Sequence, residues 1–220
     1  MCVLILCNER ALNKDEFEEA WSKNKDGFGY AYHAPAENAT GKVIVFKKGM
    51  MEKEDAYKEY SKISNILPHI AHFRLGSPVT PELTHPFICS EDSELDLEGI
   101  TETPLIFHNG VVSGWDKWLM NVFLALKRIP PGPWSDTRLI AIICKLLGVD
   151  ALKFIEGKYL VITTDDILMS GKFEDEKDGL IASNTSYIKS KWIGSSYNYN
   201  SNAQNIHNGC ARSQQDEFFL

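Results

Sequence analysis

The sequence lacks the features that mark membrane-spanning, secreted and nucleic-acid-binding proteins. No apolar run is long enough to span a bilayer, and the first residues lack the basic and cleavage regions of a secretory signal. Basic residues are not in excess, because 23 Lys and Arg stand against 30 Asp and Glu, a formal net charge of -7. That balance disfavours nucleic acid and anionic membranes as partners. We therefore expect a cytoplasmic protein that binds neither.

Cysteine is present, but in no pattern that builds a disulfide framework or a zinc site. The number of cysteines is odd, none forms a CxxC pair, and no HExxH helix brings two histidines together. We therefore expect reduced thiols and no metal, with Cys7 and Cys144 in the core. The five positions are Cys2, Cys7, Cys89, Cys144 and Cys210.

The length and composition allow one domain, or at most two small ones. The chain has 220 residues, of which 44% are hydrophobic and 24% charged, values that are ordinary for a globular protein with a sizeable core. From Ser195 onward the sequence is rich in Ser, Asn, Gln and Gly and poor in aliphatic residues. Such a segment cannot bury enough apolar surface to offset the entropy of ordering. We therefore predict a domain over residues 1–194 and a flexible tail over 195–220.

Apolar periodicity predicts strands and helices without the regular alternation of a doubly wound sheet, and neighbouring strands are expected to be antiparallel. The acidic stretch 91–98 is expected to be a solvated excursion. The expected strands cover 3–6, 28–32, 42–48 (ended by Gly49), 70–74, 105–108, 159–163, 167–170 and 180–183. The expected helices cover 13–23 with Asn13 as N-cap, 53–66, 115–128, and a segment starting at Ser135 whose core face holds Leu139, Ile140, Ile143 and Leu147.

The cysteine directly behind the initiator methionine is the first candidate for chemistry. If Met1 is removed, which the small side chain of Cys2 permits, one residue carries both a thiol and a free α-amine. Their unperturbed pKa values are about 8.5 and about 8, so the amine is a suitable base for the thiol near neutral pH. The alternative is that Cys2 is a small apolar residue that opens a buried strand. Only partners elsewhere in the chain distinguish the two.

Three later sites are weak alone but complementary together. Asn109-Gly110 is a common hairpin turn, Arg74 at a strand end suits a surface ion pair, and Asp136 suits the start of a helix. An amino-acid substrate carries an α-carboxylate, an α-ammonium and a side-chain carbonyl. Arginine can bind the carboxylate, and an aspartate can bind the ammonium. An Asn side-chain amide and a Gly N–H can together stabilise the oxyanion that forms when a thiolate attacks the carbonyl.

Six motifs follow one another along the sequence: Cys2, Asp26-Gly27-Phe28-Gly29, His72-Phe73-Arg74-Leu75-Gly76-Ser77, Thr84-His85-Pro86-Phe87, His108-Asn109-Gly110 and Ser135-Asp136-Thr137. In this order they resemble the glutaminase domain of the class II glutamine amidotransferases, which belong to the N-terminal-nucleophile hydrolases. The resemblance runs from Cys2 to about Ile188, and the six motifs in sequence make it specific. A further segment, Ala182-Ser183-Asn184-Thr185, looks like the closing strand of the family.

The resemblance implies an α+β fold, a four-layer αββα sandwich of two mainly antiparallel sheets with Cys2 at the start of a central strand. It implies a thioester mechanism without metal or organic cofactor. The resemblance implies that Cys2 is the nucleophile, that its α-amine is the general base, and that Asn109 and Gly110 form the oxyanion hole. It implies that Arg74 binds the glutamine carboxylate and that Asp136 binds the α-ammonium. Ser77 stands in place of a threonine that contacts the substrate, and His85 is implied to be a supporting residue beside the pocket.

Two departures from the family keep three functions open. Ser77 is followed by Pro78-Val79, where the family often has histidine and glycine, and no synthetase or transferase domain follows the glutaminase-like part. The first function is a glutaminase that passes ammonia to a separate acceptor enzyme. The second is a stand-alone hydrolase of another γ-glutamyl or linear amide. The third is a catalytically silent binding or regulatory module.

Overall fold

The computed structural model describes residues 1–37, 41–185 and 188. The contacts of the chain divide it into one unit, Met1–Lys189, and a second, Ser190–Leu220, which lies outside the described residues. The predicted tail 195–220 and Cys210 lie there too, so the boundary at residue 194 stays a prediction.

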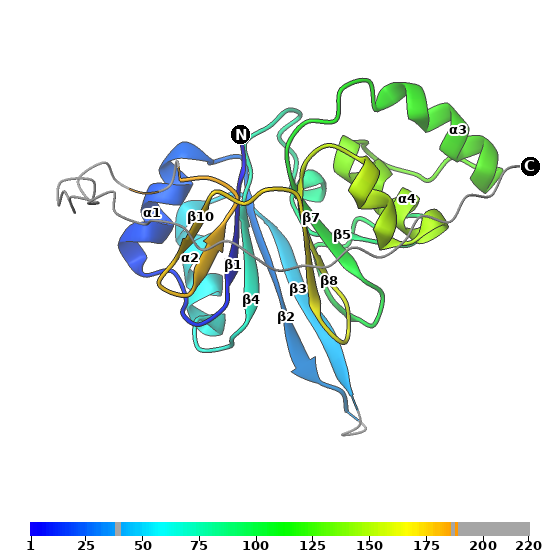
Figure 1. The fold of residues 1–220 in the computed structure, drawn as a ribbon. Helices are drawn as coiled ribbons and strands as arrows, with labels where there is room; N and C mark the ends of the chain where they lie inside the picture. Colours follow the sequence, from blue (N-terminus) through cyan, green and yellow to red (C-terminus); the bar gives the residue numbers. More distant parts are fainter. Residues whose placement is uncertain (38–40, 186–187, 189–220) are drawn as a thin grey trace, which may run out of the picture. The chain divides into compact units, whose positions relative to one another are not determined.

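The described part of the first unit is built in four layers (Figure 1). Two helices cover one face of a large sheet, a smaller sheet packs on its other face, and two further helices cover the smaller sheet. All paired strands are antiparallel. The predicted αββα sandwich is therefore confirmed.

The strands of the larger sheet, among the described residues, run in the order β10 (Asp175–Lys177), β11 (Leu180–Ala182), β1 (Val3–Cys7), β4 (His69–Phe73), β2 (Phe28–Pro35), β3 (Lys42–Met50) and β6 (Glu98–Thr101). The smaller sheet has the order β5 (Phe87–Ile88), β7 (Leu105–Asn109), β8 (Lys158–Ile162) and β9 (Ile167–Ser170). The helices are α1 (Lys14–Lys23), α2 (Lys53–Ile63), α3 (Asp116–Leu126) and α4 (Asp136–Leu147), with short 3₁₀ turns η1 (Pro81–Leu83) and η2 (Val149–Phe154).

The first strand lies inside the larger sheet, between β4 and β11, and it is buried on both faces because helices cover one face and the smaller sheet covers the other. Successive side chains of a strand point to opposite faces. Val3 and Ile5 accordingly join the core under α1 and α2, whereas Leu4 and Leu6 join the core between the two sheets. The even-numbered residues of β1 thus face the smaller sheet, which explains why this segment reads as a continuous apolar run.

Both predicted helix caps are present. Asn13 forms a capping box with Glu16, in which the Asn13 side chain accepts from the Glu16 N–H and the Glu16 carboxylate accepts from the Asn13 N–H, each at 2.9 Å. Ser135 caps α4 by accepting from the N–H of Arg138 at 3.2 Å. These caps fix where α1 and α4 begin.

Several element boundaries differ from the sequence-based prediction. Gly49 does not end β3, because its N–H donates to the Thr84 hydroxyl and the strand continues to Met50. The helix predicted over 53–66 ends at Ile63, and the acidic stretch is not all solvated loop, since Glu98 begins β6 against β3. β10 escaped prediction because its three residues, Asp175–Lys177, show no apolar alternation.

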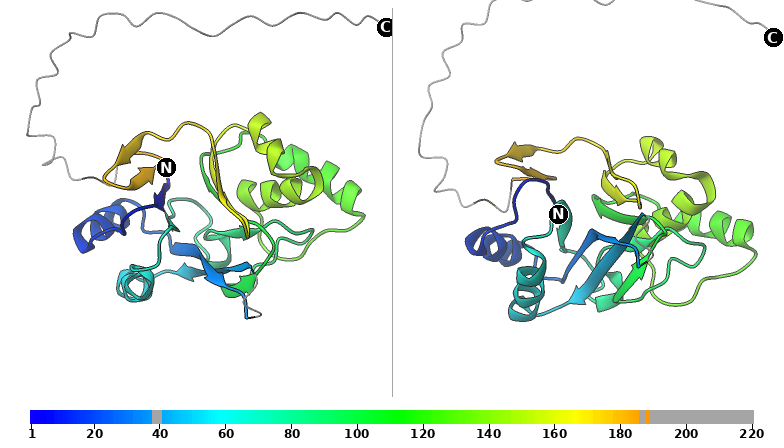
Figure 2. Two further views of the ribbon diagram at one scale, coloured as in Figure 1. Left: turned by 60° about the horizontal axis from the view of Figure 1, so that its bottom comes forward. Right: turned by 90° about the horizontal axis from the view of Figure 1, so that it is seen from below.

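The α3–α4 layer exposes more apolar surface than its sequence suggests. Figure 2 shows the two helices of this layer. Within α3 only Val122 is buried, while Met120 and Leu124 are exposed. In α4, Leu147 was predicted to face the core but is 73% exposed, whereas Leu139 is fully buried. Among the described residues no helix combines the length and the apolar character needed to cross a membrane.

Candidate active site

Three of the predicted site residues lie at one end of the space between the sheets. Cys2 precedes β1, Arg74 follows β4, and Asn109 ends β7; β1 and β4 are antiparallel, with Val3 opposite Phe73. Every second side chain of a strand points to the same face of its sheet. Leu4, Ile70 and Phe107 face the core between the sheets. Cys2, Arg74 and Asn109 lie an even number of residues from them, so they face the same space. Figure 1 shows the chain start, marked N, at this end of the sheets.

The Cys2 thiol is partly buried against the loop after β4. Its Sγ lies 3.4 Å from the Leu75 nitrogen, which donates to it, and 3.5 Å from the Leu75 carbonyl oxygen. Burial raises the pKa of this thiol, while the Leu75 N–H and the positive charge of Arg74 act in the opposite direction. The thiol is therefore protonated at neutral pH, and its use as a nucleophile requires a base.

Arg74 is 6% exposed and held in place by its own loop. Its Nη1 donates to the Gly76 carbonyl oxygen at 2.8 Å, and the Gly76 N–H donates to the Asp26 carboxylate at 2.9 Å. Burial lowers the pKa of Arg74, and the charges of Cys2, Asp26 and Asp136 oppose that shift. A fixed, charged guanidinium therefore stands beside the thiol, where it can bind a carboxylate.

Asn109 connects the two sheets beside Cys2. Its Nδ2 donates to the Ser183 hydroxyl at 2.7 Å, and the same hydroxyl accepts from the Leu4 N–H at 3.0 Å. Asn109 is 3% exposed and its Oδ1 has no hydrogen-bond partner in the described part of the chain. The amide nitrogen carries two hydrogens, so one of them remains for a ligand at this end of the sheets.

Gly110, directly after β7, has to be a glycine because the His108 ring leaves no room for a side chain there. A Cβ at this position would lie 2.7 Å from Nε2 of His108, which is closer than real Cβ contacts allow. Gly157 lies against the same ring, and a Cβ there would lie 2.6 Å from Nε2 of His108. Because Gly110 has no side chain, its own main chain can approach a bound group closely.

Asp136 lies at the start of α4, with its carboxylate oriented by main-chain donors. One oxygen accepts from the Val112 N–H at 3.1 Å and the other from the Thr137 N–H at 2.7 Å. Its negative charge raises the pKa values of both Cys2 and Arg74. The carboxylate is therefore part of the same electrostatic cluster and suits a cationic group.

Ser77 and His85 occupy different surroundings from these residues. Ser77 is exposed on the loop after Arg74, with a cis peptide bond to Pro78. His85 is 5% exposed, and its Nδ1 lies 2.7 Å from Nε2 of His72. The structure thus brings Cys2, Arg74, Asn109, Gly110 and Asp136 to one end of the sandwich, leaves Ser77 at its surface and buries His85.

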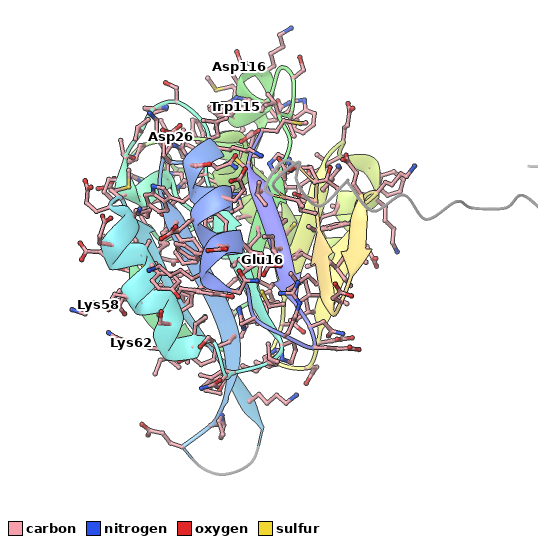
Figure 3. All side chains as sticks on the ribbon, turned by 90° about the vertical axis from the view of Figure 1, so that its left-hand side faces the viewer. Glu16, Asp26, Lys58, Lys62, Trp115 and Asp116 are labelled. Carbon is pink, nitrogen blue, oxygen red and sulfur yellow. The ribbon has the colours of Figure 1, made fainter. Side chains whose placement is uncertain are left out.

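Sequence reasoning assigned no role to three residues that hold this cluster together. Asp26 orients the Gly76 main chain, Ser183 bridges the sheets, and Asn184 Nδ2 donates to the Cys2 carbonyl oxygen at 2.8 Å. All three lie inside motifs that the sequence analysis identified, so motif membership was the available signal. Figure 3 shows Asp26 at the same end of the unit as Trp115 and Asp116, at the start of α3. No group of three or more His, Cys, Asp or Glu in the described residues is placed to hold a metal ion.

Comparison with solved structures identifies the architecture. The glutamine phosphoribosylpyrophosphate (PRPP) amidotransferase from B. subtilis, complexed with ADP and GMP, superposes with a TM-score of 0.55 at 14% identity, over 85% of this chain and 42% of its own. The fold is that of the N-terminal-nucleophile hydrolases. A structure described as the allosteric regulatory enzyme of purine biosynthesis gives a TM-score of 0.55 at 15% identity, over 83% of this chain and 41% of its own.

The chain spans less than half of the length of these neighbours. No protein-family model matches the sequence, and no curated protein matches it. The likeness to the N-terminal-nucleophile hydrolases is therefore one of fold.

Proposed function

We propose that this protein hydrolyses the side-chain amide of glutamine to glutamate and ammonia through a thioester on Cys2. The observation that carries the proposal is the meeting of a thiol, a buried guanidinium and a carboxylate at one end of the inter-sheet space. These groups match an amino-acid amide in both charge and chemistry. The N-terminal-nucleophile hydrolase fold, whose solved neighbours include an amidotransferase named for glutamine, supports the same reading.

The substrate is held by its two charged ends. Arg74 binds the α-carboxylate, for which a fixed guanidinium is the best match among side chains. Asp136 binds the α-ammonium. This arrangement directs the side-chain carbonyl toward Cys2, with its oxygen toward the Asn109 amide and the Gly110 N–H. Losing one such oxyanion donor typically raises the barrier by about 2.7–4 kcal/mol.

The reaction begins with transfer of the Cys2 thiol proton to the α-amine of the same residue. The thiolate attacks the amide carbon, and the tetrahedral oxyanion is stabilised by Asn109 and Gly110. The C–N bond breaks as the ammonium returns its proton to the leaving nitrogen, which departs as ammonia. Water, deprotonated by the same amine, then hydrolyses the thioester to release glutamate and the thiol.

Removal of Met1 is a condition of this mechanism. With Met1 attached, the Cys2 nitrogen is an amide and cannot accept a proton. Because burial raises the pKa of the thiol, spontaneous ionisation does not replace the missing base. Met1 is 76% exposed, so it is accessible for excision.

The fate of the ammonia and the location of the protein extend the proposal. Transfer to a separate acceptor enzyme stays a prediction, as does the absence of nucleic-acid and membrane partners. A reducing cytoplasm suits the free thiols of Cys2, Cys7, Cys89 and Cys144.

A second candidate function is hydrolysis of another γ-glutamyl or linear amide. The loop after Arg74 favours it, because Ser77 is followed by Pro78 and the 54% exposed Val79, where the family that the sequence resembles often has histidine and glycine. The third function, a silent binding module, is opposed by the electrostatic cluster around Cys2.

The decisive experiment compares wild type with Cys2→Ala after intact-mass measurement of Met1 removal. We expect wild type to release glutamate and ammonia from glutamine and Cys2→Ala to release neither while keeping its circular dichroism spectrum. Cys89→Ala, at a buried thiol remote from the proposed chemistry, serves as the matched control and should keep turnover. Undiminished release by Cys2→Ala would refute the mechanism. A strong preference for another γ-glutamyl amide would select the second function, and no turnover by the processed protein the third.

A further inference from the structure

Three buried histidines lie in contact behind the candidate site. His72 is fully buried, His108 is 2% exposed and His85 is 5% exposed, and they come from β4, β7 and the loop before β5. His72 Nε2 lies 3.2 Å from the His108 carbonyl oxygen and 2.7 Å from His85 Nδ1. A carbonyl only accepts, so His72 Nε2 carries the hydrogen and shares it between that oxygen and His85 Nδ1.

The environment keeps these rings neutral. Burial lowers the pKa of His72 to about 3 and of His108 to about 4, and it holds the pKa of His85 well below its usual value. The positive charges that face His85 come from Arg74 beyond β4 and Lys48 on β3, and they act in the same direction. The carboxylate of Asp136 faces His108 and opposes the shift without reversing it. Neutral rings can donate and accept in one fixed pattern.

His108 connects this histidine pair to α4. Its Nδ1 lies 3.1 Å from the Thr137 hydroxyl, which in turn donates to an Asp136 oxygen at 3.3 Å. The imidazole is also stacked on Tyr159, with ring centroids 4.6 Å apart and planes 11° from parallel. His72 on the larger sheet thus holds the carbonyl group of His108, and Thr137 on α4 holds its ring.

We propose that His72, His85, His108 and Thr137 form a positioning network that fixes the oxyanion pair on β7 relative to the ammonium-binding carboxylate on α4. The inference rests on the proposed amidase function. His72 acts on the main chain one residue before Asn109-Gly110, and Thr137 acts on the carboxylate of Asp136. None of the four contacts substrate, so each acts through a neighbour.

The backbone around the network is shaped to admit it. A Cβ on Gly29 would collide with the carbonyl oxygen of His85, so β2 can pass the His85 main chain only as glycine. Phe87 packs against the His85 ring with centroids 5.4 Å apart. His85 is therefore enclosed by β2, β4 and β5 and can hold His72 in one orientation.

The network predicts two different kinetic defects. Misplacing a catalytic group by about 1 Å can cost roughly 100-fold in rate. His72→Leu, which keeps the volume and removes the donor, should lower kcat by about 10- to 100-fold with KM changed less than about threefold. Thr137→Val, which removes only the hydroxyl, should raise KM for glutamine about tenfold with kcat changed less than about threefold, as expected for one weakened charged hydrogen bond.

Conservative variants separate positioning from general damage. His72→Gln keeps a donor near Nε2 and Thr137→Ser keeps the hydroxyl, so each should restore most of the lost parameter. Alkylation of Cys2 by iodoacetamide, followed by peptide mass spectrometry, should proceed at the wild-type rate in all four variants because the nucleophile is not the group affected. Binding of glutamine to Cys2→Ala, with and without Thr137→Val, measures the same KM effect without turnover.

The outcomes are distinguishable from failure of the proposed function. If wild type is active and His72→Leu keeps its kcat, or if Leu and Gln at position 72 are equally impaired, the network is refuted while the amidase function stands. Slowed alkylation of Cys2 in His72→Leu would also refute it. If the processed wild type neither hydrolyses nor binds glutamine, the amidase function fails and the network role fails with it.

Discussion

A thiol and a guanidinium that are both partly withdrawn from water interact more strongly than the same groups at a surface. Arg74 is held by the Gly76 carbonyl oxygen, and its charge favours ionised Cys2. At the scale of single residues the site therefore combines two effects. Burial opposes the thiolate, and the neighbouring cation favours it. In the proposed mechanism a base supplies the difference, so the free α-amine of processed Cys2 is the critical group of the proposal.

Replacing Arg74 with lysine should keep the charge and lose the planar pair of donors. Because a lysine cannot form the two-pronged bond to a carboxylate, KM for glutamine should rise by at least about tenfold, the effect of one charge-assisted hydrogen bond. Steady-state kinetics of ammonia release measure it. Arg128→Lys is the matched control, since Arg128 forms its ion pairs with Glu91 and Asp92 on the exposed acidic stretch. An unchanged KM in Arg74→Lys would remove Arg74 from substrate binding.

At this scale the sequence predicted the residues that carry opposite charges and missed those that orient them. Cys2, Arg74 and Asp136 attract notice because their side chains have obvious chemistry. Ser183 and Thr137 act by hydrogen bonds between segments far apart in the chain, at 2.7 Å to Asn109 and 3.1 Å to His108. Such contacts depend on strand order and register, which periodicity does not reveal.

The helix α4 shows how one element serves both the core and the site. Its N-terminal turn carries Asp136 and Thr137 beside the candidate active site, and the residues that follow are buried against the smaller sheet. Arg138 in the same turn is 1% exposed and donates to the main-chain oxygens of Asp92, Pro131 and Pro133. These bonds fix the position of the helix and hence of the carboxylate.

Two leucines of α4 should respond very differently to truncation. Leu139 is fully buried, so Leu139→Ala should lower the free energy of unfolding by about 2–5 kcal/mol. Leu147 is 73% exposed, so Leu147→Ala should change it by less than about 0.5 kcal/mol. Urea denaturation followed by circular dichroism measures both. Similar losses for the two variants would show that the end of α4 is covered in solution.

Element prediction succeeded where apolar alternation and caps coincide and failed where tertiary contacts decide. Asn13 with Glu16 and Ser135 with Asp136 marked two helix starts correctly. Leu147 was misassigned because the core-facing surface of α4 ends with Cys144, and no helical pattern shows where a neighbouring layer stops. β6 was missed because pairing with β3, rather than its own composition, makes it a strand.

At the scale of the whole molecule, most of the six histidines of the sequence are buried. Four of them, His69, His72, His85 and His108, are buried with pKa values below the ordinary one, mainly because burial penalises the charged ring. In the unfolded chain the same groups take up protons near pH 6.5. The unfolded state therefore binds more protons below that pH, and the folded state loses stability as the pH falls.

We expect the free energy of unfolding to fall as pH is lowered from 6.5 to 5.0, by up to about 1.4 kcal/mol per pH unit for each histidine involved. Unfolded carboxylates titrate mainly below this window. Lys48, with its pKa lowered to about 7, stays largely protonated within it. Urea titrations at several pH values give the slope. His69→Gln and His72→Gln should each reduce it, whereas a slope unchanged in both variants would contradict the assignment.

The opening strand of the sequence acquires its second neighbour from a segment that is synthesised long after it. Ile5, Leu6 and Cys7 pair with Ala182, Ile181 and Leu180, and Asn184 secures the main chain of Cys2 itself. During translation the start of the chain must therefore wait, with one edge of β1 unpaired, until residues 180–184 have left the ribosome. Under the proposed function, we expect a nascent chain that is stalled before residue 180 not to turn over glutamine.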